Sequence, residues 1–195
     1  MNASQFDQDY YDRYYFNPRT RIADPGYFER VADFLAAYLK LLDCRVLRAL
    51  DVGCGAGLLH PGLRRAFPRV HIEGIDVSPW ACAQYGWRCV SIEDFAETRR
   101  YDLVICHDVI QYLDDQRAEA ALAKLCALTR TALFFSVLTR EDWDENCDQH
   151  LTDGNAYLRS ADWYRQRLAP LLANAGGGLY IRRNTSVVLY ALEHC

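Results

Sequence analysis

The 195-residue sequence predicts a single α/β domain built on a doubly wound, mostly parallel sheet. From Val46 onward, short apolar runs alternate with stretches of helical periodicity, the pattern of repeated strand-helix-strand units. A glycine-rich turn follows the first apolar run, as expected where a strand leads into a helix. Apolar residues make up 51% of the chain and charged residues 25%, the balance of an ordinary globular protein.

The N-terminal segment predicts an irregular arm followed by a helix. The first 22 residues show no sustained period and mix aromatic residues with arginines. Asp24 followed by Pro25 is a helix start, a capping side chain before a proline at the first helical position. Apolar residues then recur at helical spacing as far as Leu42, so this helix is expected to pack one face on a core.

The remaining elements follow from the alternation of apolar runs and helical stretches. We predict strands at residues 46–52, 70–76, 88–91, 101–106 and 131–137, and helices at residues 57–67, 78–85, 115–129 and 160–172. Near the end, residues 179–183 and 187–192 flank Asn184-Thr185-Ser186. They predict an antiparallel hairpin after the triple glycine at 176–178.

Charge and hydropathy exclude several classes of partner. The net charge is −4, and lysines and arginines form no long run, so the sequence predicts no nucleic-acid surface and favours a small-molecule substrate. No apolar run is long enough to cross a bilayer, and the start Met1-Asn-Ala-Ser-Gln-Phe-Asp7 does not resemble a secretion signal. We therefore expect no membrane association and a cytoplasmic location.

The eight cysteines are expected to be reduced packing residues, because most lie in apolar runs and none forms a CxxC pair. Cys147-Asp-Gln-His150 has a spacing suited to metal binding. No second Cys/His pair completes a zinc set, so no metal site is predicted.

The segment Asp51-Val-Gly-Cys-Gly-Ala-Gly57 carries the strongest indication of function. Glycines allow a sharp turn and a close approach of the backbone to a ligand, although a tight turn without a ligand would look the same. The next strand ends at Asp76, 19 residues beyond Gly57, a separation that brings a carboxylate to the hydroxyls of a bound ribose. A dinucleotide fingerprint would place a glycine where Leu58 stands. The spacing therefore favours S-adenosylmethionine (SAM) over NAD.

Together with the segment Tyr101-Asp-Leu-Val-Ile-Cys-His-Asp-Val-Ile-Gln-Tyr-Leu113, these motifs resemble class I SAM-dependent methyltransferases, over residues 46–137. The last segment is similar to one in the ubiquinone-biosynthesis and small-molecule group. The resemblance implies a seven-stranded sheet of order 3-2-1-4-5-7-6 with a C-terminal antiparallel hairpin. It also implies methyl transfer to an oxygen or nitrogen of a small molecule, with S-adenosylhomocysteine (SAH) as the product. Residues 1–45 would then close over a SAM-binding domain at residues 46–195.

The resemblance also implies which residues hold SAM. The amino-acid end would lie against the turn and near Asp51, the ribose at Asp76, and the adenine on Val77. Ser91 stands where the family often has an acid for the adenine amine, so that contact is expected from Ile92 and Glu93. The other implied contacts are Gly53, Cys54, Gly55 and Gly57 of the turn, Cys106 and His107 near the sulfonium, and Arg19 or Arg21 at the carboxylate.

Candidate catalytic residues are His107, His150 and Tyr14. A histidine at the edge where the acceptor enters could deprotonate a hydroxyl near neutral pH, although His107 could instead only bind SAM or the backbone. His150 lies in an acidic loop that could simply be exposed. Aromatic residues could cover the cleft or only the core; they are Tyr11, Tyr14, Tyr15 and Trp143. The remaining histidines, His60, His71 and His194, are expected at the surface or in packing. Three arginines are expected on the solvated face of the late helix, namely Arg159, Arg165 and Arg167.

Three other functions remain open at this point. A nucleic-acid or protein methyltransferase is one, although the acidic balance and the lack of an appended recognition domain oppose it. A NAD-dependent oxidoreductase could use the same type of fold, although the glycine spacing opposes it. A SAM-binding regulatory or scaffold protein without methyl transfer would carry the same motifs, because methyltransferases need no obligatory nucleophile.

Overall fold

The computed structural model describes residues 3–190, which form a seven-stranded sheet of order β3-β2-β1-β4-β5-β7-β6. The first five strands are parallel, and β7 pairs antiparallel with both β5 and β6. The predicted fold class and strand order are confirmed. The strands are β1 (Arg48–Val52), β2 (His71–Asp76), β3 (Arg88–Cys89), β4 (Tyr101–His107), β5 (Thr129–Ser136), β6 (Leu172–Gly176) and β7 (Leu179–Arg182).

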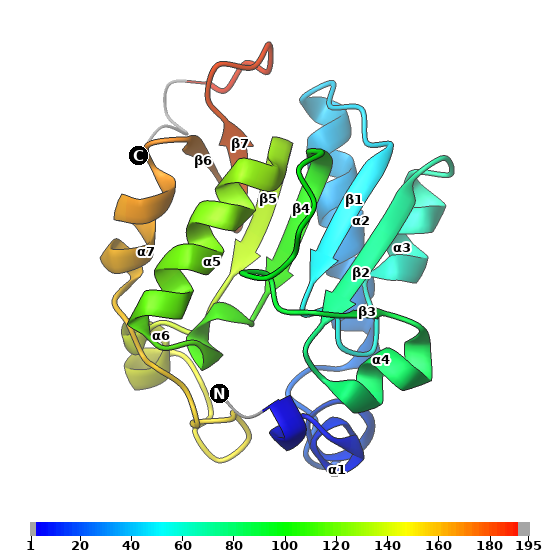
Figure 1. The fold of residues 1–195 in the computed structure, drawn as a ribbon, viewed down its shortest axis with the longest axis vertical. Helices are drawn as coiled ribbons and strands as arrows, with labels where there is room; N and C mark the ends of the chain where they lie inside the picture. The colour runs from blue at the N-terminus through cyan, green and yellow to red at the C-terminus, as the bar shows by residue number, and fades with distance from the viewer. Residues whose placement is uncertain (1–2, 191–195) are drawn as a thin grey trace.

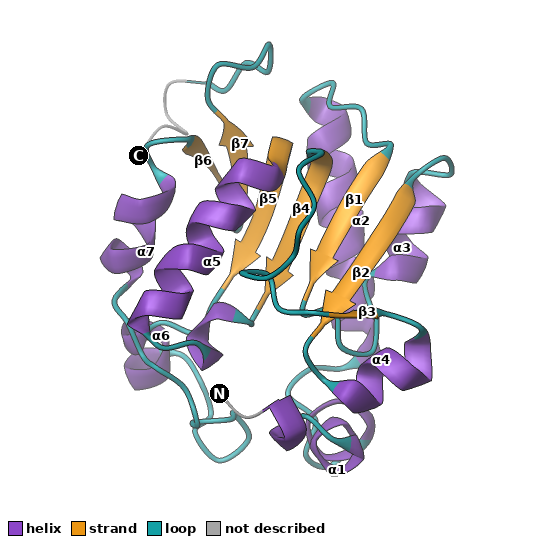
Figure 2. Ribbon diagram, in the orientation of Figure 1, coloured by secondary structure: helices purple, strands orange, loops and turns teal. Residues whose placement is uncertain are grey.

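Helices cover both faces of the sheet (Figures 1 and 2). α2 (Pro25–Leu41) and α3 (His60–Ala66) pack on one face, and α5 (Asp115–Leu128) and α7 (Ala161–Leu168) pack on the other. Along β4, Leu103 and Ile105 face the first layer, whereas Val104 and Cys106 face the second, and all four are fully buried. A strand buried on both faces reads as a continuous apolar run, which is why the sequence located it well.

The carboxyl ends of the parallel strands point toward the N-terminal arm (Figure 1). Two short helices, α4 (Pro79–Tyr85) and α6 (Arg140–Glu145), follow β2 and β5 near this edge. Asp24 caps α2 by accepting a hydrogen bond from the Tyr27 amide at 3.0 Å, as its position in the sequence predicts. This edge is where a doubly wound sheet places its ligands.

The arm is helical, so the prediction of an irregular segment is wrong. It contains a 3-10 turn (Ala3–Gln5), the helix α1 (Gln8–Tyr11) and a turn of π-helix (Asp12–Phe16). Asp7 caps α1 by accepting a hydrogen bond from the Tyr10 amide at 3.0 Å. Each piece is too short to show a hydrophobic period, which explains why the sequence pattern did not reveal them.

The C-terminal hairpin exists but lies earlier than predicted. β6 and β7 pair with each other, and Gly176, Gly177 and Gly178 form the turn between them with φ of 88°, 57° and 79°. Three successive residues in this left-handed region favour glycine, so the triple glycine is the turn rather than its prelude. The helix predicted at 160–172 is α7, which ends at Leu168. The last residue predicted as helical, Leu172, is already the first residue of β6.

The second predicted hairpin strand, at 187–192, is not formed over its described part. Residues 187–190 have no regular secondary structure, and residues 191–192, His194 and Cys195 lie outside the described residues.

Phe34 is one of the apolar residues at helical spacing in α2 and was therefore expected on its core face. It is 40% exposed, and its ring covers Gly177, where a Cβ would lie 2.6 Å from it.

Arg159 is buried, contrary to the predicted solvated helix face. It precedes α7 rather than lying on it, and its guanidinium reaches back to the start of α5. There Nε donates to the Asp115 carboxylate at 2.8 Å. The side chain therefore connects the loop before α7 to the helix layer.

Seven of the cysteines are described, and all are free thiols: Cys44, Cys54, Cys82, Cys106 and Cys126 are buried, Cys147 is half-buried and Cys89 is exposed. Within residues 3–190, no helix combines the length and the apolar run needed to cross a lipid bilayer.

Candidate active site

The turn after β1 has a backbone that favours glycine. Gly53, Gly55 and Gly57 have φ of 65°, 50° and 66°. A Cβ at Gly53 would also lie only 2.4 Å from the Val109 side chain. The alternate glycines therefore serve both the left-handed backbone and the close approach of the segment after β4.

Asp76, at the end of β2, is buried against this turn. Its Oδ2 accepts a hydrogen bond from the Gly55 amide and its Oδ1 accepts one from the Ser78 amide, both at 2.8 Å. Burial raises the pKa of this carboxyl, while the two backbone donors act in the opposite direction. Each carboxylate oxygen keeps capacity for a further donor, so Asp76 can accept hydrogen bonds from two hydroxyls.

Asp51, at the other end of the same turn, forms a buried pair with His60. The Asp51 Oδ2 and His60 Nε2 atoms lie 2.9 Å apart, and both side chains are almost fully buried. His60 therefore has a packing role, one of the two places expected for it.

Trp87 packs against the turn, a contact that the sequence did not indicate. Its indole Nε1 donates to the Gly55 carbonyl at 2.7 Å. The ring also covers Gly57 and Gly74, since a Cβ at either position would lie 2.8 Å from it. No motif surrounds this tryptophan. Its position just after the left-handed cap Gly86 is the one local sign that the chain turns back there.

The N-terminal arm covers the turn at Gly55. The Tyr11 ring lies 3.2 Å from the position of a Cβ on Gly55 and stacks on Trp80, with ring centroids 4.8 Å apart. The Ser78 hydroxyl donates to the Phe6 carbonyl at 2.5 Å, which fixes the start of the arm to α4. Two small cavities, of about 40 and 60 Å³, lie over the turn.

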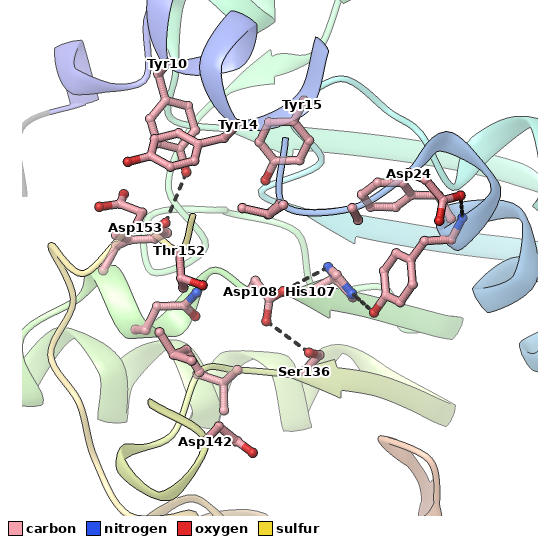
Figure 3. A pocket seen from close by; sticks show the side chains of 18 of the residues that line it. Tyr10, Tyr14, Tyr15, Asp24, His107, Asp108, Ser136, Asp142, Thr152 and Asp153 are labelled. Atoms are coloured by element: carbon pink, nitrogen blue, oxygen red, sulfur yellow. Dashed lines mark hydrogen bonds and ion pairs between the residues drawn. The ribbon is translucent and has the colours of Figure 1, made fainter. Parts of the chain in front are cut away.

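A larger cavity of about 660 Å³ lies beside the turn (Figure 3). The arm, the start of α2, the end of β4 and the loop after β5 contribute its walls. Its tyrosines are Tyr10, Tyr14, Tyr15, Tyr27 and Tyr112. His107 lines this cavity as well as the two small ones, so it stands where they meet.

The His107 ring is held on three sides. Its Nε2 lies 3.2 Å from the Tyr27 hydroxyl and its Nδ1 lies 3.5 Å from Asp108 Oδ2. One face of the ring stacks on Phe134 with a centroid separation of 5.7 Å. A carboxylate at Nδ1 favours the tautomer with its proton on that nitrogen, which leaves Nε2 as an acceptor toward Tyr27.

Asp108 adopts a left-handed backbone with φ of 56°, which is unusual for a residue other than glycine. Ser136 holds it there. The Asp108 amide donates to the Ser136 carbonyl at 2.9 Å, and the Ser136 hydroxyl donates to Asp108 Oδ1 at 3.0 Å. Strained backbone of this kind concentrates at functional sites, where the surrounding structure maintains it.

The structure gathers most of the predicted site residues and separates the others. The small cavities are lined, among others, by Asp51, Gly53, Cys54, Gly55, Asp76, Val77 and His107. Five predicted contacts line none of the three cavities, namely Gly57, Ile92, Glu93, Cys106 and Arg21. Trp87 covers Gly57, Ile92 and Cys106 are buried in the core, and Glu93 forms an ion pair with Arg117 at 2.8 Å.

The candidate catalytic residues are divided in the same way. His107 and Tyr14 line the larger cavity, whereas His150 is exposed and lines none of the three. Trp143 instead covers Gly154 in the acidic loop, where a Cβ would lie 2.7 Å from the ring.

Sequence reasoning missed several residues of the larger cavity: Tyr27, Gln111, Tyr112, Ser136, Asp142 and Asp153. Gln111 and Tyr112 stand inside the motif after β4, so their place in the chain was a usable signal. Asp142 belongs to the acidic segment at residues 141–150, which reads equally well as an exposed loop, and Asp153 follows three residues after that segment.

Comparisons with known proteins agree with this architecture. A family model described as "Methyltransferase domain" matches residues 22–184. The chain is similar to a ubiquinone biosynthesis O-methyltransferase from Xanthomonas oryzae pv. oryzae, with 32% identity over 124 residues, covering 55% of this chain and 48% of that protein. A protein of the same name from Hahella chejuensis is 30% identical over 106 residues, covering 48% and 44%. The chain thus spans about half the length of these curated relatives.

Solved structures show the same fold. The magnesium protoporphyrin IX methyltransferase from Synechocystis, solved with SAM, superimposes with a TM-score of 0.63 at 18% identity, covering 93% of this chain and 98% of that one. An amino pentose methyltransferase from Micromonospora echinaspora superimposes with a TM-score of 0.61 at 16% identity, covering 84% and 94%.

Proposed function

Because the chain belongs to the family of class I SAM-dependent methyltransferases, we propose that it transfers a methyl group from SAM to an oxygen or nitrogen atom of a small molecule. The observation that carries the proposal is the turn after β1 with Asp76 beside it. A buried carboxylate on a glycine turn, at the carboxyl edge of a parallel sheet, suits a ligand with a ribose.

The residues of the turn fit this cofactor. Asp76 can accept hydrogen bonds from both ribose hydroxyls while it keeps its two backbone donors. Val77, Gly53 and Gly55 line the same small cavity as Asp76, which supports the assignment of Val77 to the adenine and of the glycines to the amino-acid end. When bound, SAM supplies an electrophilic methyl carbon, whose bond to sulfur breaks as the acceptor lone pair bonds to it, leaving SAH.

The arm must move before a nucleoside can enter. Pockets for ligands of this size measure roughly 300 to 1,000 Å³. The cavities over the turn measure about 40 and 60 Å³. Tyr11 occupies the space directly above Gly55, so cofactor binding requires that this ring leave its stack on Trp80.

We propose His107 as the group that accepts a proton from the acceptor. It lines both small cavities and the larger one, and its Nε2 lies 3.2 Å from the hydroxyl of Tyr27, so an acceptor hydroxyl would take the place of the Tyr27 hydroxyl at this nitrogen. A hydroxyl acceptor would give its proton to Nε2, whereas a neutral amine would need a base only after it is methylated. The larger cavity, at about 660 Å³, is the space for the acceptor.

Calorimetry with SAM and with SAH tests the cofactor, and transfer of labelled methyl groups to an acceptor panel tests the reaction. We expect both ligands to bind and SAM to be converted to SAH. Absence of binding at millimolar ligand would refute the proposal. Binding without turnover across a broad panel would identify a SAM-binding regulatory protein, and NADH titration serves as the control for an oxidoreductase.

A further inference from the structure

The acceptor cavity contains more carboxylates than cations. Arg30 is the one arginine among the described residues that line it, and no lysine lines it. The Arg30 guanidinium lies 3.2 Å from the Asp24 carboxylate, so these two charges offset each other. Three further aspartates then line the cavity without a lysine or arginine partner there: Asp108, Asp142 and Asp153.

The described hydrogen-bond donors of these carboxylates are neutral. Asp142 accepts hydrogen bonds from the Thr139 hydroxyl at 2.6 Å and the Asn146 amide at 3.0 Å. The Thr139 hydrogen bond lowers the Asp142 pKa, which keeps the carboxylate ionised. Asp153 accepts from the Asn155 backbone amide at 3.0 Å. These donors stabilise the negative charge without removing it.

Asp108 also accepts its side-chain hydrogen bond from a neutral donor. Its Oδ1 accepts from the Ser136 hydroxyl, and its Oδ2 faces His107 Nδ1 at 3.5 Å. A neutral imidazole, which the base role of His107 requires, leaves the carboxylate charge in place. The acceptor cavity is therefore electrostatically negative on several of its walls.

Gln111 adds an independent indication of a ligand. It lines the cavity and is 4% exposed, and its Oε1 is one of two buried side-chain polar atoms, among the described residues, without a hydrogen-bond partner. A buried carbonyl oxygen without a donor costs about 1–3 kcal/mol. A ligand that brings an N–H group would remove that cost.

The tyrosines complete an environment suited to a cation, because aromatic faces attract positive charge. Burial raises the pKa of Tyr14, and the Asp153 carboxylate raises it further. Burial also raises the pKa of Tyr27, with Asp108 acting in the same direction. Asp153 thus lies near the Tyr14 ring, as Figure 3 shows, and the raised pKa values keep both tyrosine hydroxyls neutral.

We propose that the methyl acceptor carries a positively charged amino group, which is held in this cavity by the combined negative charge of Asp108, Asp142 and Asp153, by the tyrosine rings and by the Gln111 amide oxygen. This inference rests on the proposed function. An ammonium group offers only donors, which matches a set of acceptors. Its nitrogen has no lone pair, so the methylated atom is a different one, facing His107. Acceptors with a carboxylate or phosphate in this position are disfavoured by like charge.

Three phenols of similar size but different charge provide the test: tyramine, 4-ethylphenol and 4-hydroxyphenylacetate. Their affinities are measured by calorimetry on the protein saturated with SAH, at low and high salt. We expect tyramine to bind about tenfold more tightly than 4-ethylphenol, which corresponds to about 1.4 kcal/mol, and to lose that advantage at high salt. Equal binding of the three, tighter binding of the anion, or no binding of tyramine at millimolar concentration would overturn the proposal.

Substitutions test whether the carboxylates of the cavity cause the preference for tyramine over 4-ethylphenol. Asp153→Asn and Asp142→Asn each remove one charge and keep the shape, so each should reduce the preference for tyramine over 4-ethylphenol by several-fold. Asp144→Asn is the matched control, because Asp144 is exposed on α6 and does not line the cavity. An unchanged preference in both cavity variants would contradict the inference. The SAH affinity of each variant is measured first, so that loss of the cofactor site is recognised separately.

Discussion

The hydroxyl of Tyr27 and Nε2 of His107 lie 3.2 Å apart, although one residue belongs to the first long helix and the other ends the fourth strand. The Tyr27 hydroxyl occupies the lone pair of the nitrogen that would serve as the base, and both residues line the acceptor cavity. It also marks the position that an acceptor hydroxyl would take when it gives up its proton.

His107→Ala should lower kcat for a hydroxyl acceptor by about 10²–10⁴-fold, the usual contribution of a general base. Tyr27→Phe keeps the imidazole and removes only its partner, so most of the rate should remain. Single-turnover methyl transfer as a function of pH distinguishes the two variants. If His107→Ala reacted at the wild-type rate, the base assignment would be wrong.

Tyr11→Ala should tighten SAH binding and speed its association, because the tyrosine ring occupies the space above Gly55. Tyr14→Ala is the control. It changes a ring of the same arm that faces the acceptor cavity, and SAH affinity should stay unchanged. Stopped-flow fluorescence is suitable, since Tyr11 stacks on Trp80. Weaker SAH binding by Tyr11→Ala would show that the ring is a wall of the bound state.

Asp76→Asn should weaken SAH binding by at least about tenfold, since a hydrogen bond to a charged group contributes about 1.5–3 kcal/mol. Burial raises the pKa of Asp76, and its carboxylate is charged only above that pKa. Wild-type affinity should therefore fall as the pH is lowered, beginning at a higher pH than an ordinary aspartate would show. The variant should lack this dependence. Calorimetry across a pH series measures both effects.

Gly53→Ala should destabilise the protein more than Gly86→Ala. Both residues have positive φ, so both alanines meet a left-handed penalty of about 1–2 kcal/mol. A Cβ at Gly86 meets no atom within 4 Å, whereas one at Gly53 collides with Val109. Urea unfolding of the two variants isolates the collision. Equal losses would indicate that the segment after β4 moves aside freely.

Much of the fold was predictable because its signals are local or periodic. The apolar run of β4 and the cap at Asp24 each identify an element without knowledge of the rest of the chain. The hairpin was misplaced because two runs on either side of Asn184 resemble strands, while pairing with β5 and the left-handed backbone at 176–178 decide the register.

The candidate site was predictable where residues share one strand end and not where distant segments meet. Asp76 and the glycine turn follow from spacing. Tyr27 and Asp153 enter the cavity from a helix and a loop whose approach depends on the tertiary packing. No motif marked Trp87 apart from the preceding Gly86, because its role depends on the glycines against which it packs.

Tyr10 and Tyr15 line both the acceptor cavity and one of the small cavities over the turn. A displacement of the arm for one ligand therefore reshapes the wall that the other ligand meets. Occupancy of the two sites is then thermodynamically coupled, and by reciprocity each ligand alters the affinity of the other by the same factor. Through this common wall, the affinity for the acceptor depends on whether the nucleoside is bound, and a displacement of the arm by one ligand changes the surroundings that the other finds.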